Sequence, residues 1–160
     1  MIPYDASDIR AGAHSDYGSI TLLFQRPSQP GLEIFDDSTW SPVEVYPPGT
    51  ETDTFPPILV NIGDVLSYWT SGLLKSTRHR VVFPTGGKEG DRYSIAYFCH
   101  PVDTTPLVSV PSRMVEKRLK NPDEVTEIRE ETKVMTAGEY LQSRLEATYV
   151  HLHQDDLVHE

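Results

Sequence analysis

The sequence from about residue 9 to residue 110 is a series of short β-rich runs, and this feature constrains the fold more than any other. Clusters of Gly, Pro, Asp and Ser separate the runs, as expected for strands that are joined by turns. The eight runs are Gly18 to Gln25, Leu32 to Phe35, Val43 to Tyr46, Ile58 to Ile62, Val65 to Trp69, Arg78 to Phe83, Arg92 to Cys99 and Leu107 to Val110. Strands of this length and spacing predict a mainly β fold, either a sandwich or a barrel.

The length and charge of the chain exclude several function classes. A chain of 160 residues makes one domain and buries enough surface for a core without disulfides. A formal net charge of −10 argues against nucleic acid or an anionic membrane as a partner, because both require a basic face. No apolar run approaches the roughly 20 residues that span a bilayer. The single cysteine, Cys99, suits a reducing compartment, so we expect a cytoplasmic protein.

The character of the sequence changes after Pro111. Residues 113–133 are dense in charge, which predicts an insertion at the surface. The run Thr136-Ala137-Gly138-Glu139 is a capping box, so a helix should begin there. Apolar side chains then recur along one stripe at helical spacing, and we expect this helix to pack against the outside of the sheet. Residues 113–160 therefore belong to the same domain as the core at 1–112.

Three candidate metal ligands lie on or beside the predicted strands. Side chains at i and i+2 of a strand share one face, so His14 and Asp16 present an imidazole and a carboxylate side by side. His79 shares a face with Val81 and Phe83, where a single histidine is more often a core residue with one backbone hydrogen bond. Two histidines and one carboxylate can form a facial triad that holds non-haem Fe(II) and leaves three positions open. The same set suits zinc with an activated water, although no general base is evident nearby.

A candidate anchor for a carboxylate lies in the run that ends at Cys99. Arg92, Ser94, Ala96 and Phe98 alternate onto one face, so the arginine and the serine are neighbours there. A guanidinium group and a hydroxyl group together make a fork of donors that suits a carboxylate. An isolated Arg-x-Ser is more often a solvated edge, but beside a metal triad it indicates a site for an organic acid.

Further motifs accompany these residues. The stretches concerned are Ala11 to Leu23, Gly31 to Glu33, Trp40, Val60 to Asp64, Ser76 to Val81, Arg92 to Phe98 and Thr136 to Leu141. Together they resemble the catalytic domain of the iron- and 2-oxoglutarate-dependent oxygenases of the isopenicillin N synthase-like class. The resemblance runs from about Arg10 to Val110 and again from Thr136 to Tyr149, with the metal triplet, the distal histidine and the Arg-x-Ser in the family's order.

The resemblance implies a fold, a site and an activity. The fold is a double-stranded β-helix, a cupin-like jelly roll with the metal between its two sheets. His14, Asp16 and His79 would bind Fe(II), while Arg92 and Ser94 would hold the distal carboxylate of 2-oxoglutarate. The family uses O2 to oxidise a small organic molecule, usually by hydroxylation, and releases succinate and CO2. Ascorbate is implied as an accessory reductant.

Two other matches are assigned to structure rather than to chemistry. Asn61 to Asp64 contains a strand-ending Gly-Asp, which makes a tight turn more naturally than a site. Trp40 is assigned to packing. Four aromatic residues are candidates for the wall of an apolar pocket, with buried packing as the alternative role for each. They are Tyr17, Tyr68, Trp69 and Phe98.

The chain departs from the family pattern before His14. Only thirteen residues precede that histidine, so we expect most of the first jelly-roll strand and the family's N-terminal region to be missing. A missing strand leaves a sheet edge free to pair with another copy of the chain, although the sequence does not determine the oligomeric state. It also leaves an alternative to an enzyme: a catalytically silent relative that serves as a metal- or ligand-binding module.

Overall fold

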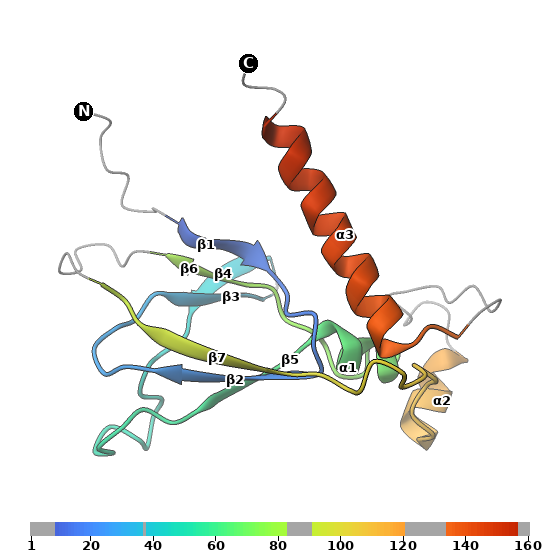
Figure 1. Cartoon of the computed structure of the whole chain (residues 1–160). Helices are drawn as coiled ribbons and strands as arrows, with labels where there is room; N and C mark the ends of the chain where they lie inside the picture. The colour runs from blue at the N-terminus through green and yellow to red at the C-terminus, as the bar shows by residue number, and fades with distance from the viewer. Residues whose placement is uncertain (1–8, 37, 83–90, 121–133, 157–160) are drawn as a thin grey trace.

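The computed structural model describes residues 9–36, 38–82, 91–120 and 134–156, which form two facing antiparallel sheets with three helices at one end (Figure 1). The strand orders are β1-β6-β3-β4 in one sheet and β5-β2-β7 in the other. The strands are β1 (Ile9–His14), β2 (Ile20–Gln25), β3 (Leu32–Asp36), β4 (Thr39–Pro42), β5 (Leu59–Ile62), β6 (His79–Val82) and β7 (Ser94–Cys99). The helices are α1 (Asp64–Trp69), α2 (Arg113–Leu119) and α3 (Ala137–Asp156).

The two sheets confirm the predicted mainly β jelly roll, and alternation along their strands positions the site. Leu23 of β2, Leu59 of β5 and Ala96 of β7 line a pocket between the sheets, as does Val81 of β6. Their neighbours in the chain point to the opposite faces, as the pleat of a strand requires. Every second residue of these strands therefore faces the space between the sheets.

A hydrophobic core joins the helices at one end of the sandwich. Val65 is fully buried in α1, and it packs with Leu107, Ala137 and Tyr140. The predicted capping box begins α3: the Thr136 N–H donates to Glu139 Oε2 at 2.9 Å, and the Glu139 N–H donates to Thr136 Oγ1 at 3.2 Å. As Figure 1 shows, α3 lies outside the two sheets, and its buried residues contact α1 rather than a sheet face.

Three of the predicted strands are wrong. Val65 to Trp69 is helix α1, because its apolar residues at i, i+3 and i+4 face the helical core. Val43 to Tyr46 lies between prolines and joins no strand of the described structure, apart from one bond from the Val43 N–H to the Leu32 carbonyl. Leu107 to Val110 forms hydrogen bonds to Met135 and Trp69, in loop and helix, and its buried residue Leu107 belongs to the helical core.

The charged stretch after Pro111 is described in part. It begins with α2, whose N-cap Ser112 accepts a hydrogen bond from the Met114 N–H at 3.3 Å. Residues 121–133 lie outside the described part of the chain. Among the described helices, none combines the length and the apolar character that crossing a bilayer requires.

Candidate metal centre and adjoining pocket

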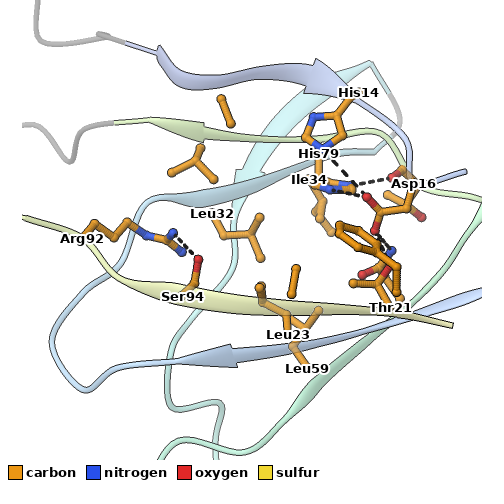
Figure 2. Close-up of a pocket in the computed structure, with 16 residues that line it drawn as sticks. His14, Asp16, Thr21, Leu23, Leu32, Ile34, Leu59, His79, Arg92 and Ser94 are labelled. Carbon is orange, nitrogen blue, oxygen red and sulfur yellow. Dashed lines mark hydrogen bonds and ion pairs between the residues drawn. The ribbon is translucent and has the colours of Figure 1, made fainter. Parts of the chain in front are cut away.

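The register of β1 on β6 brings the predicted metal ligands together. His14 lies opposite His79 across this strand pair, and Asp16 follows directly in the loop to β2. Asp16 Oδ1 lies 3.8 Å from His14 Nε2 and 3.6 Å from His79 Nε2. The three ligand atoms lie within 4.8 Å of one another, and Figure 2 shows the side chains converging at one end of the pocket. Residues far apart in the sequence therefore form one cluster.

Both imidazole rings are held in the tautomer that suits a metal ligand. Nδ1 of His14 lies 2.7 Å from the Gly12 carbonyl oxygen, and Nδ1 of His79 lies 3.1 Å from that of Thr77. A carbonyl oxygen only accepts, so each Nδ1 donates a hydrogen, which leaves a lone pair on each Nε2. Two lone pairs and one carboxylate oxygen then face a common centre, where a divalent cation would satisfy all three. This donor set fits Fe(II) in a two-histidine, one-carboxylate site.

The two oxygens of the Asp16 carboxylate have different partners. The residue is 6% exposed, and its Oδ2 accepts from Thr21 Oγ1 at 2.6 Å and from Asn61 Nδ2 at 2.8 Å. Thr21 and Asn61 lie opposite each other in the β2–β5 pair, so the donors converge from adjacent strands. Oδ2 is thereby saturated, and Oδ1 is left to face the histidines.

Assigning the stretch from Asn61 to Asp64 to turn geometry is therefore wrong for Asn61, whose side chain contacts a candidate ligand. A polar residue at an inward position of an apolar strand was the available signal, because such a group requires a buried partner. Trp40 does serve packing, since its ring contacts Phe35 at 5.1 Å and lies 4.1 Å from the Arg80 guanidinium carbon.

The candidate carboxylate anchor lies at the opposite end of the same pocket (Figure 2). Arg92 Nη1 donates to Ser94 Oγ at 3.2 Å, as the shared strand face predicts. Its Nε donates to the Pro30 carbonyl at 3.2 Å, and its Nη2 contacts Gln25 Oε1 at 3.5 Å. These contacts hold the guanidinium group at the wall of the pocket, where its fork of donors suits a carboxylate ligand.

Apolar side chains line the rest of the pocket, and Leu23, Leu32 and Leu59 lie between its two ends (Figure 2). The other apolar residues of the lining include Ile34, Val81 and Phe98. Of the four aromatic candidates for its wall, only Phe98 lines it. Tyr68 and Trp69 pack in the helical core instead, and Tyr17 lies beneath Arg144.

In the described structure β1 and β7 are edge strands of their sheets, and pocket residues on or next to these two strands are exposed. Phe98 is 54% exposed although it lines the pocket, and Ser94 is also exposed. The His14 side chain is 47% exposed, whereas that of Asp16 is 5% exposed. A ligand can therefore reach the three-residue cluster from the side of these two strands without a change in the sheets.

Comparison with known proteins identifies the family to which the chain is similar. The sequence profile of the 2OG-Fe(II) oxygenase superfamily matches residues 3–101. A UPF0676 protein of Schizosaccharomyces pombe is 44% identical over 147 residues, which cover 89% of this chain and 38% of that protein. A proline hydroxylase of Petromyces alliaceus is 42% identical over 148 residues, covering 88% of this chain and 41% of the relative. The chain thus spans about two fifths of the length of these relatives.

Solved structures of similar proteins have the same fold. A full-length Neurospora crassa protein in complex with alpha-KG is 36% identical, with a TM-score of 0.62 over 88% of this chain and 38% of that one. A 2OG-Fe(II) oxygenase family protein of Caulobacter crescentus is 34% identical, with a TM-score of 0.64 over 92% of this chain and 42% of that one. The described sheets thus match the jelly roll of these structures.

Proposed function

Because this chain belongs to the 2OG-Fe(II) oxygenase superfamily, we propose that it is an Fe(II)- and 2-oxoglutarate-dependent dioxygenase that hydroxylates a small organic molecule and releases succinate and CO2. One observation carries the proposal: a single pocket has the His-Asp-His cluster at one end and the Arg92–Ser94 pair at the other. Relatives named as a proline hydroxylase and as 2-oxoglutarate-dependent dioxygenases support it.

In this proposal, each polar residue of the pocket has one task. His14, Asp16 and His79 hold Fe(II), and Arg92 and Ser94 bind the distal carboxylate of 2-oxoglutarate. The bound Fe(II) supplies the activation of O2 that is coupled to oxidative decarboxylation of 2-oxoglutarate. These three side chains would supply three ligands, which would leave room at the metal for the co-substrate.

The remaining residues of the pocket orient these groups. Thr21 and Asn61 occupy Asp16 Oδ2, so that the carboxylate offers a single oxygen to the metal. Leu23, Leu32 and Leu59 lie between the two polar ends and keep water away from the carbon chain of the co-substrate. Because an arginine binds a carboxylate through two parallel hydrogen bonds, the anchor fixes the direction in which the keto acid reaches the metal.

The proposal also covers the class within the superfamily, the partners, the location and the domain bounds. The motifs shared with the isopenicillin N synthase-like class support membership of that class. A net charge of −10 supports a protein without nucleic-acid or membrane partners, and a single cysteine supports a cytoplasmic location. Residues 1–112 supply the jelly-roll core, and residues 113–160 complete the same domain through the helical core around α1.

The proposal is tested by anaerobic absorption spectroscopy. Addition of Fe(II) and 2-oxoglutarate should produce the visible charge-transfer band of a metal-bound keto acid, and admission of air should yield succinate. Asp16→Ala and His79→Ala should abolish the band. His100→Ala is the matched control, because His100 is exposed and does not belong to the cluster. An unmodified chain that gives neither band nor succinate would refute the proposal.

The exposed residues of the pocket favour a second candidate, a metal- and ligand-binding module without turnover. Phe98 is 54% exposed beside the cluster, so water reaches positions that a reactive site normally shields. The same experiment distinguishes the two candidates. A charge-transfer band without succinate in air would identify the binding module, whereas a band with succinate would identify the enzyme.

A further inference from the structure

Helix α3 reaches the loop that carries Asp16, although the two segments are far apart in the sequence. Arg144 Nη2 lies 3.3 Å from Asp64 Oδ2, and the Arg144 guanidinium carbon lies 5.3 Å from the centre of the Tyr17 ring. One turn further along α3, the Thr148 hydroxyl is hydrogen-bonded to the Tyr17 hydroxyl. Positions i and i+4 share one helix face, so a single face of α3 is directed at this loop.

Asp64 connects Arg144 to the two residues that precede Tyr17. Its Oδ2 accepts from Ser15 Oγ at 3.1 Å, and its N–H donates to the Asp16 carbonyl at 2.7 Å. The Asp64 side chain is 11% exposed, so its carboxylate oxygens need the donors that surround them. The ion pair with Arg144 therefore stabilises the Asp64 carboxylate, which contacts Ser15. The backbone of the same residue, Asp64, holds Asp16.

The backbone of the loop is already fixed from the start of α1. The Gly63 N–H donates to the Ser19 carbonyl at 2.9 Å, and the Val65 N–H donates to the Gly18 carbonyl at 3.1 Å. Arg144 adds a different restraint, because it acts on the side chains of Asp64 and Tyr17. Loss of Arg144 would thus leave the main chain anchored but loosen the residues on either side of Asp16.

We propose that Arg144 is a positioning residue for the metal centre, which acts through Asp64 and Tyr17 to keep Asp16 Oδ1 directed at the two histidines. The inference rests on the metal site of the proposed function. Partners that orient metal ligands typically change metal affinity by about 10- to 100-fold when removed. Arg144 acts one contact further away, so we expect the lower end, about a tenfold loss.

The test measures Co(II) binding through its visible absorption, together with the thermal midpoint of the metal-free protein. Arg144→Met should raise the Kd for Co(II) about tenfold, and Arg144→Lys should recover part of the loss because it retains the charge. Arg118→Met is the matched control. Arg118 also joins a helix to the rest of the fold, through a 2.7 Å bond to the Ser71 carbonyl, but it lies outside the metal cluster. Its removal should lower the midpoint and leave the Kd unchanged.

A double-mutant cycle separates positioning from general destabilisation. Asp64→Asn keeps an acceptor for Ser15 but removes the charge that attracts Arg144, so it should weaken Co(II) binding in the same way. If both residues act through one contact, the double variant should bind Co(II) no more weakly than Arg144→Met alone. Additive losses, or an Arg144→Met variant with the unmodified affinity, would overturn the inference. Should Arg144→Met fail to fold, Arg144→Lys and Asp64→Asn carry the comparison.

The same titration distinguishes this inference from the proposed function. An unmodified chain that binds no Co(II) would refute the metal site and the role of Arg144 with it. If the unmodified chain and Arg144→Met bind Co(II) equally well, only the role of Arg144 is refuted.

Discussion

Two hydrogen bonds that end on the same oxygen orient the carboxylate of Asp16 directly. Thr21 and Asn61 both donate to Oδ2, and the two histidines face Oδ1. Hydrogen bonds to a charged acceptor contribute about 1.5–3 kcal/mol each. Either donor is therefore strong enough to affect both the fold and the metal site.

Thr21→Val should weaken metal binding, because valine keeps the shape of threonine but cannot donate to Asp16 Oδ2. We expect the Kd for Co(II) to rise about tenfold and the metal-free protein to lose about 1.5–3 kcal/mol of unfolding free energy. Co(II) titration and urea denaturation measure the two effects. Thr39→Val is the control, since Thr39 is exposed and donates to the Asp36 carbonyl at 3.2 Å, away from the cluster. Equal losses in both variants would contradict a specific role for Thr21.

Arg92→Lys should weaken binding of 2-oxoglutarate without changing that of the metal. Lysine keeps the charge but loses the planar fork that Pro30 and Gln25 orient. Loss of a charge-assisted hydrogen bond, about 1.5–3 kcal/mol, corresponds to a rise of about 10- to 150-fold in the Kd for 2-oxoglutarate. Titration of the Mn(II)-loaded protein with 2-oxoglutarate measures it. An unchanged affinity would place the co-substrate carboxylate elsewhere.

A site residue could be predicted when the residues that determine its role lie close to it in the sequence. His14 and Asp16 are two positions apart, and their shared face follows from local alternation. The contacts of Asp16 with Thr21 and Asn61 depend on cross-strand register, since Thr21 and Asn61 meet only when β2 pairs with β5. Arg144 lies further still, and its approach depends on how α3 packs against α1. Neither relation is encoded in a local pattern.

At the scale of elements, α1 shows why a short apolar run is ambiguous. The run Val65 to Trp69 has a length and composition that suit a buried strand as well as a short helix. The helix forms because Gly63 brings the chain against the loop of Asp16, where three successive N–H groups donate to loop carbonyls. The capping box of α3 was predictable, in contrast, because both of its hydrogen bonds lie within four residues.

Gly63→Ala should destabilise the protein, because a Cβ at this position would lie 2.2 Å from the Gly18 carbonyl oxygen. Backbone is on both sides of the contact, so α1 and the loop must separate, at a cost of about 1–3 kcal/mol. Urea denaturation of the metal-free protein measures the change. Gly12→Ala is the control, since nothing lies within 4 Å of a Cβ there. If the two variants were equally stable, the close approach of α1 to the loop would be wrong.

At the scale of the whole molecule, the sandwich has one face that the described elements leave uncovered. The outer face of the β5–β2–β7 sheet carries exposed apolar side chains: Phe24 at 41%, Val60 at 57%, Ile95 at 69% and Tyr97 at 61%. Cross-strand pairing makes them neighbours, since Phe24 lies opposite Ile95, and Leu22 pairs with both Val60 and Tyr97. A contiguous apolar face of this kind is typical of an interaction surface.

The edge of this sheet also favours association with another chain, because β7 pairs only with β2 in the described structure. A free edge beside an apolar face favours pairing with another chain. We therefore expect the 160-residue chain to self-associate through this sheet, and Ile95→Lys with Tyr97→Lys should shift it toward monomer. Light scattering over a concentration series measures the mass. Val102→Lys is the control, because Val102 is 73% exposed in a loop outside the sheet. A wild-type chain that stays monomeric throughout the series would show that the apolar face does not drive association.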